Sequence, residues 1–152
     1  MVRCALRRRE SGRDQRGAAA VEFALVAPLL IMLVFGIIGY GMMLSFRQTL
    51  SQAATEGARA AAVQLDGSKR DESATAALDD ALGALEVGGT TLACGEAHVT
   101  CEVDPPVSCG PAQCVTVTVS YPYRDHPVVP TLPFLDQTLP ETLTYSATVR
   151  VS

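Results

Sequence analysis

The stretch FALVAPLLIMLVFGIIGYGMMLSF, residues 23–46, decides the architecture of this 152-residue chain, because none of its 24 side chains is charged. Thirteen of them are Leu, Ile, Val or Phe. As an α-helix rising ~1.5 Å per residue it would extend roughly 36 Å, and the hydrocarbon core of a bilayer is about 30 Å thick. With the small residues before it, the stretch predicts a transmembrane helix over residues 18–46.

Two other kinds of segment share this composition. A buried core helix would need an apolar cover on all its sides, which the small remainder of the chain is poorly able to supply. A secretory signal has an apolar region of only ~7–15 residues and ends at a small-residue cleavage site. Here the apolar stretch continues without interruption to Arg47, so its length favours a retained membrane span.

Charge is distributed unequally on the two sides of this stretch. The first sixteen residues hold six arginines and two acids, a net charge of +4, while the rest of the chain carries −8 and the whole chain −4. The positive-inside rule therefore predicts that residues 1–17 are a basic cytoplasmic leader and that the C-terminal part is extracytoplasmic. The acidic balance, with a pI of about 5.1, argues against a nucleic-acid partner.

Past the span, residues 47–65 are predicted to extend the helix outside the membrane. One helix from 18 to 65 would be about 70 Å long at ~1.5 Å per residue. Small residues recur every four positions, which forms a shallow ridge suited to close helix–helix contact, although an Ala-rich chain also produces such ladders by chance. We expect these ladder positions, together with the bend at Pro28, to shape helix packing: Gly41, Ser45, Thr49, Ala53, Gly57 and Ala61.

Residues 66–152 are predicted to form a small head. Asp66–Arg70 is expected to be a linker, and Asp71–Leu85 a short helix that Gly88-Gly89 ends. Alternating patterns then predict three strands, at His98–Val103, Cys114–Tyr121 and Thr142–Val151. A Pro-rich loop separates the last two strands. The expected fold class is α+β: a long N-terminal helix, one short helix and an antiparallel sheet.

The head contains four of the five cysteines, Cys94, Cys101, Cys109 and Cys114, and the fifth, Cys4, lies in the leader. An even number of cysteines outside the cytoplasm predicts two disulfides, for which three connectivities remain open. A metal site at Cys94, His98 and Cys101 is the alternative, but it lacks the tight Cys pairing usual for zinc. Since no catalytic or cofactor-binding motif is present, we expect no enzyme activity, no catalytic residue, no metal and no cofactor.

The entry to the apolar stretch reads Arg16-Gly17-Ala18-Ala19-Ala20-Val21-Glu22-Phe23. A carboxylate such as Glu22 costs about 2.5–3.5 kcal/mol at mid-bilayer and less near the boundary. One interpretation is that Glu22 reaches back to the cytoplasmic interface and the leader arginines. The other is that the frame resembles the prepilin-peptidase site of type IV pilins and pseudopilins. That resemblance implies cleavage between Gly17 and Ala18, and pairing of Glu22 with the new α-ammonium of a neighbouring subunit.

The match extends further along the chain. The blocks RGAAAVEFALVAPLL (16–30), FGIIGYG (35–41) and RQTLSQAATEGARAAA (47–62) resemble, in order and spacing, the TadE-like family, the pseudopilins of tight-adherence (Tad/Flp) pilus assembly. Two positions depart from the family's usual pattern: Gly39 stands where an acidic residue is frequent, and Thr55 where a basic one is.

The resemblance implies a pseudopilin-like subunit of the bacterial inner membrane, with a single span and a cytoplasmic N-terminus. Its expected partners are the membrane, a prepilin peptidase, other pilins or pseudopilins, and the Tad assembly proteins. The alternative is an uncleaved single-pass protein whose extracytoplasmic head is a binding module, with the Gly–Glu frame incidental.

Overall fold

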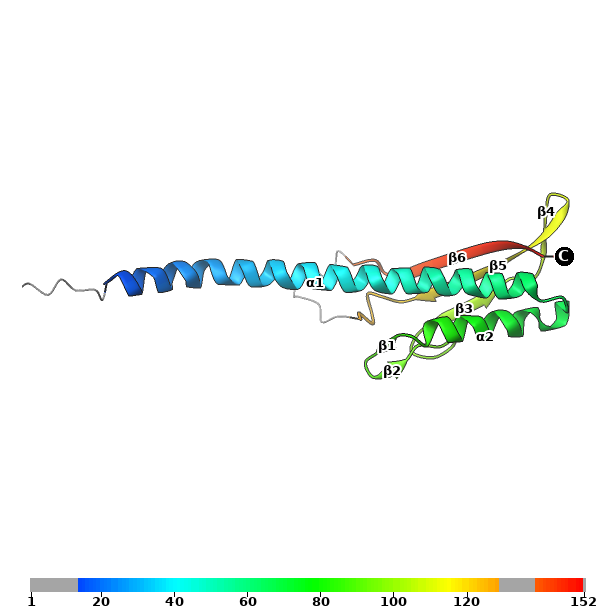
Figure 1. Ribbon diagram of the computed structural model, residues 1–152, viewed down its shortest axis with the longest axis horizontal. Coiled ribbons are helices and arrows are strands. Elements are labelled where there is room, and N and C mark those ends of the chain that lie inside the picture. The colour runs from blue at the N-terminus through cyan, green and yellow to red at the C-terminus, as the bar shows by residue number, and fades with distance from the viewer. Residues whose placement is uncertain (1–13, 129–138, 152) are drawn as a thin grey trace, which may run out of the picture. The chain divides into compact units, whose positions relative to one another are not determined.

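The computed structural model describes residues 14–128 and 139–151, with the side chains of the first helix described from Gly17 onward. A 50-residue helix, α1 (Asp14–Val63), is followed by a 3-10 turn (Gly67–Lys69) and by helix α2 (Arg70–Leu82). Six strands come next along the chain: β1 (Glu86–Val87), β2 (Thr90–Thr91), β3 (Thr100–Val103), β4 (Val107–Cys109), β5 (Ala112–Tyr121) and β6 (Leu143–Val151) (Figure 1). The predicted α+β class is confirmed.

The chain divides into two compact units, Met1–Ile38 and Gly39–Ser152, which we call the N-terminal unit and the folded unit. In its described part the N-terminal unit is helical throughout. Every large apolar side chain from Val21 to Ile38 is at least 50% exposed, so nothing in the described chain covers this segment. The region Gly17–Val63 is the one helix of the described chain long and apolar enough to cross a membrane.

Strand β5 is the centre of an antiparallel sheet in the folded unit. Strand β6 pairs with one edge of β5 along its whole length, from Gln113 opposite Val151 to Tyr121 opposite Leu143. The other edge of β5 is shared by β3 and β4, which lie one after the other along it. The sequence Asp104-Pro105-Pro106 separates these two short strands, because proline has no N–H to donate to the ladder.

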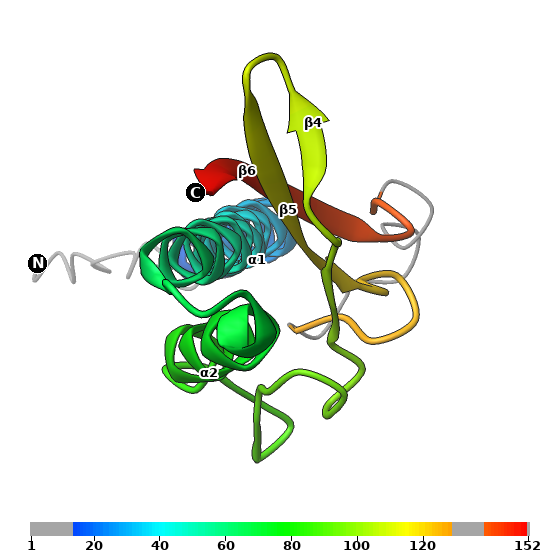
Figure 2. The ribbon, with the colours of Figure 1, turned by 90° about the vertical axis from the view of Figure 1, so that its right-hand side faces the viewer.

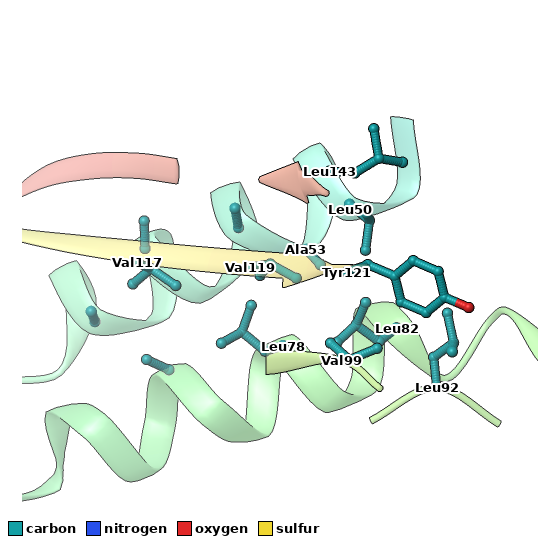
Figure 3. Packing of buried hydrophobic residues seen from close by; sticks show 14 of the residues in the cluster. Leu50, Ala53, Leu78, Leu82, Leu92, Val99, Val117, Val119, Tyr121 and Leu143 are labelled. Atoms are coloured by element: carbon teal, nitrogen blue, oxygen red, sulfur yellow. The ribbon is translucent and has the colours of Figure 1, made fainter. Parts of the chain in front are cut away.

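The core lies between this sheet and the two helices, α1 and α2 (Figure 2). Alternate residues of β5 point to the helices and are buried, in the order Val115, Val117, Val119 and Tyr121. Figure 3 shows Leu50 and Ala53 of α1, and Leu78 and Leu82 of α2, packed together with side chains of β5. The sheet thus buries one face under a layer of two helices, which gives a two-layer α+β unit.

The structure corrects the predicted end of helix α2. The helix begins at Arg70, where Asp71 and Glu72 in the first turn suit the positive end of the helix dipole, but it ends at Leu82, three residues before the predicted end. Gly88-Gly89 does not stop the helix. Both glycines have positive φ, +61° and +82°, and they form the tight turn between β1 and β2. Glycine adopts such conformations at no steric cost, and here the pair forms the turn of a hairpin.

The predicted strand at His98–Val103 begins later, at Thr100. Ala97 and His98 have φ of +46° and +66°, so they belong to a turn and not to a strand. The other two predicted strands are confirmed, at β5 and β6. The short strands β1, β2 and β4 were not predicted, since runs of two or three residues carry no periodic signal.

Parts of the predictions lie outside the described residues. These are residues 1–13 of the leader with Cys4, and Pro130 and Pro133 of the Pro-rich loop. Residues 14–17 begin α1. The domain boundaries at 17, 46 and 65 stay predictions.

Candidate functional site

The N-terminal part of α1 carries the residues of the predicted processing site. Gly17, Ala18 and Glu22 all lie within this helix and are exposed. Ala18 and Glu22 are four residues apart, so they lie on the same face of the helix one turn from each other. Each is therefore accessible in the described structure, and the role of each remains a prediction.

The C-terminal part of α1 belongs to the core of the folded unit. Its buried residues follow the spacing of one helix face, namely Phe46, Leu50, Ala53, Ala54, Gly57, Ala58 and Ala61. This face packs against α2 and the sheet. Residues 47–65, the predicted extracytoplasmic extension, lie wholly within the folded unit.

Phe46 closes the apolar stretch in the sequence, yet in the structure it is only 2% exposed. Its ring lies edge-on to that of Tyr121 with the centroids 4.8 Å apart, and 5.9 Å from the ring of Tyr123. Such aromatic pairs add about 0.5–1.5 kcal/mol beyond the burial of area. The last residue of the apolar stretch therefore anchors α1 in the folded unit.

The ladder of small residues divides into two parts. Ala53, Gly57 and Ala61 face the core, where a Cβ added to Gly57 would lie 2.8 Å from Cγ of Leu78. Gly41 and Ser45 are exposed, and nothing lies within 4 Å of a Cβ added to Gly41. The core-facing part of the ladder has an intramolecular explanation, because it lets α2 and β5 approach α1 closely. A role in contacts between subunits stays a prediction for Pro28, Gly41 and Ser45, which are exposed.

Arg70 joins the end of α1 to the start of α2. It is only 7% exposed, and its Nε donates a hydrogen bond to the carbonyl oxygen of Ala61 at 3.2 Å. That carbonyl lies in the last turn of α1, where helix carbonyls have no partner within the helix. A cation at this end also complements the helix dipole, so Arg70 stabilises the turn between the two helices.

Disulfides join Cys94 to Cys101 and Cys109 to Cys114, with Cα–Cα distances of 5.3 Å and 5.8 Å. The sequence had left three connectivities open, and the structure selects this one. The first disulfide closes the turn that precedes β3, and the second closes the hairpin of β4 and β5. Because Cys94 and Cys101 are joined, neither thiolate remains for the alternative metal site with His98. Within residues 14–128 and 139–151, no group of three or more His, Cys, Asp or Glu side chains is arranged to hold a metal ion.

The structure brings together two histidines, His98 and His126, that lie far apart in the sequence. The rings of His98 and His126 stack with their centroids 3.5 Å apart and their planes inclined by 7°. They border a hollow of about 640 Å³ with Tyr121, Asp125 and Val128. Nothing in the sequence indicated this contact, since 28 positions separate the two residues and neither lies in a strand.

Two phenols of the folded unit, those of Tyr121 and Tyr123, are buried in the core. Burial raises the pKa of Tyr121, whose hydroxyl donates a 2.8 Å hydrogen bond to the carbonyl oxygen of His126. Burial also raises the pKa of Tyr123, and the positive charge of Arg47 partly opposes that rise. Both phenols therefore favour the protonated form more than an exposed tyrosine does.

Comparison with known proteins supports one relationship. Residues 17–59 match the model of the family described as TadE-like protein. No match was found among curated proteins or among solved structures. The matched region begins at the predicted scissile glycine and ends within the part of α1 that packs in the core.

Proposed function

Because residues 17–59 form a TadE-like domain, we propose that the chain is a membrane-anchored, pseudopilin-like subunit that acts in the assembly of a Tad pilus or a related secretion apparatus. The family implicates Tad pilus assembly, and its members are generally structural and not enzymatic. The observation that carries the proposal is that this one domain includes both an uncovered apolar helix and the helix face that builds the folded unit.

The two parts of α1 would then have different tasks. Residues 18–46 include the uncovered apolar segment, which suits a single span of the bacterial inner membrane. Residues past Arg47 fix the same helix in a folded unit that contains two disulfides. Disulfides persist outside the cytoplasm, so they suit an extracytoplasmic folded unit. The arginines of the leader support a cytoplasmic N-terminus.

Maturation is the second part of the proposal. A prepilin peptidase cuts between Gly17 and Ala18, and the leader with its arginines is removed. Cleavage leaves an α-ammonium on Ala18, four residues before the exposed carboxylate of Glu22. A carboxylate in an apolar environment needs a partner, and the α-ammonium of a neighbouring subunit would supply one.

The restoration of pilus assembly in cells tests this function. In a strain that lacks the gene, Glu22→Gln removes the charge with little change of shape, and Glu56→Gln, exposed on the same helix, is the matched control. We expect both variants to reach the membrane, but only Glu56→Gln to restore pili or co-purify with the Tad assembly proteins. If the unmodified chain neither restores pili nor co-purifies with those proteins, the proposed function is wrong. If Glu22→Gln assembles as well as the unmodified chain, the proposed role of Glu22 is wrong.

A further inference from the structure

A shallow hollow of about 560 Å³ lies on the folded unit where the apolar stretch of α1 ends. Its lining comes from α1 and β6, and consists of Leu44, Arg47, Gln48, Ser51, Gln52 and Tyr145. This hollow is separate from the processing site and has no role in the packing of the core described above. Its polar lining residues carry amides, hydroxyls and one guanidinium, and none of the six is a carboxylate.

Arg47 is the unusual member of this set. Its Nε is buried and makes no hydrogen bond with any part of the chain that the structure describes. The ion pair found within the described ranges joins Arg124 and Glu141, so it does not involve Arg47. A buried N–H without an acceptor is unfavourable, and the positive charge of the same guanidinium, which borders the hollow, favours an anion there.

The lining favours an anion with several acceptor oxygens. The guanidinium of Arg47 presents a fork of N–H donors, which matches phosphate and carboxylate oxygens. Gln48 and Gln52 follow Arg47 at positions one and five along the helix, and their amides add donors. Tyr145 and Ser51 add two hydroxyls. A tetrahedral phosphate can accept from more of these groups at once than a planar carboxylate can.

The position of the hollow identifies the source of the phosphate. Leu44 lies within the uncharged stretch, and Arg47 is the first charged residue after it. If residues 18–46 span the bilayer, as the proposed function requires, Arg47 lies at the level of the lipid headgroups on the extracytoplasmic side. The lining also changes from apolar to polar in the same direction, from Leu44 through Arg47 to Gln52.

We propose that this hollow binds the phosphate of a phospholipid headgroup in the extracytoplasmic leaflet, with Arg47 as the anchoring residue. This inference rests on the membrane placement in the proposed function. The bound lipid would hold α1 at a fixed depth and rotation at the membrane surface. An acidic group of a second copy of the chain is the competing occupant, and the test separates the two.

The test uses the full chain, purified in a non-ionic detergent and titrated with dioleoylphosphatidylglycerol. Dioleoylglycerol, which has the same acyl chains and no phosphate, is the lipid control. Native mass spectrometry counts the lipids retained by the unmodified chain, by Arg47→Gln and by Arg59→Gln. Arg59 is a matched control, since it is an exposed arginine farther along the same helix.

We expect the unmodified chain and Arg59→Gln to retain one phosphatidylglycerol about tenfold or more in preference to dioleoylglycerol, as charge-assisted hydrogen bonds would give. Arg47→Gln should lose this preference, and Arg47→Lys should keep part of it. Equal retention by Arg47→Gln and the unmodified chain overturns the proposal. So does an Arg47-dependent dimer whose stability is independent of lipid, because the occupant is then a second copy.

Resistance to carbonate extraction, measured on the same variants in native membranes, distinguishes the two levels of failure. If the unmodified chain is extracted, the membrane placement is wrong and the proposed function fails with it. If every variant stays in the membrane while lipid retention is independent of Arg47, only the lipid site is wrong.

Discussion

Gly57 of α1 and Leu78 of α2 approach each other so closely that a Cβ on the glycine would lie 2.8 Å from Cγ of the leucine. The same Cβ would lie 3.2 Å from Cγ1 of Val117 in β5. Leu78 and Val117 are both fully buried, so neither can move aside freely. Gly57 is therefore the point where both helices and the sheet meet, and the chain needs a residue without a side chain there.

Gly57→Val should destabilise the folded unit by about 1–3 kcal/mol, because the added atoms overpack the core. Gly41→Val is the matched control, since it makes the same change in the same helix where nothing lies within 4 Å. The thermal unfolding midpoint of each variant in detergent, followed by near-ultraviolet circular dichroism, checks the prediction. Equal midpoints for the two variants would show that the close approach of the helices is absent.

Phe46→Ala should be more damaging, by about 3–5 kcal/mol, because it empties a buried site against Tyr121 and Tyr123. Phe35→Ala is the control, since Phe35 belongs to the same apolar stretch but is 59% exposed. The same unfolding measurement distinguishes them. A Phe46 variant as stable as the Phe35 variant would mean that α1 is not anchored in the folded unit at this point.

Peptide mapping without reduction should recover Cys94 linked to Cys101 and Cys109 linked to Cys114. Each disulfide closes a short loop, so removing either pair as a double Ser variant should cost about 2–3 kcal/mol. Any other pairing in the purified protein would contradict the structure. The number of alkylatable thiols gives a further check, because Cys4 is the one cysteine outside these pairs and is lost if the leader is cleaved.

Alkaline pH should destabilise the folded unit. Burial raises the pKa of Tyr121 above its ordinary value of 10.0, so the folded state favours the protonated phenol more than the unfolded state does. That contribution to stability is complete below about pH 10 and is lost as the pH rises through the higher pKa of the folded state. We expect the unfolding midpoint to fall as the pH rises above about 10. Tyr121→Phe should show a shallower fall and, at neutral pH, a loss of about 1 kcal/mol from the missing hydrogen bond to His126. An equally steep fall in Tyr121→Phe would exclude this phenol as the cause.

The sequence predicted the parts of the fold that have long periodic patterns. The apolar stretch specified the first helix, and the alternation in Cys114–Tyr121 specified the central strand. The distances at which these elements meet were not predictable. The small-residue ladder suggested close packing at Gly57 without indicating Leu78 as the partner, which lies 21 positions away in another helix.

Other features escaped the sequence analysis for separate physical reasons. The stacking of the His98 and His126 rings depends on two turns that are far apart in the sequence. The buried Nε of Arg47 has no acceptor because of how the folded unit packs around it, and the pattern of a single helix does not contain that information. Gly88-Gly89 was interpreted as a helix stop because a glycine pair serves both as a stop and as a hairpin turn, and only the pairing of β1 with β2 decides between them.

The N-terminal residue of the mature chain tests the central proposal most directly. The full chain is expressed with and without a prepilin peptidase, and its intact mass and N-terminal sequence are determined. We predict a chain that begins at Ala18 when the peptidase is present, and uncleaved protein when it is absent or when Gly17 is replaced by a bulky residue. A chain that still begins with its leader in the presence of the peptidase, whatever residue stands at position 17, would contradict the account.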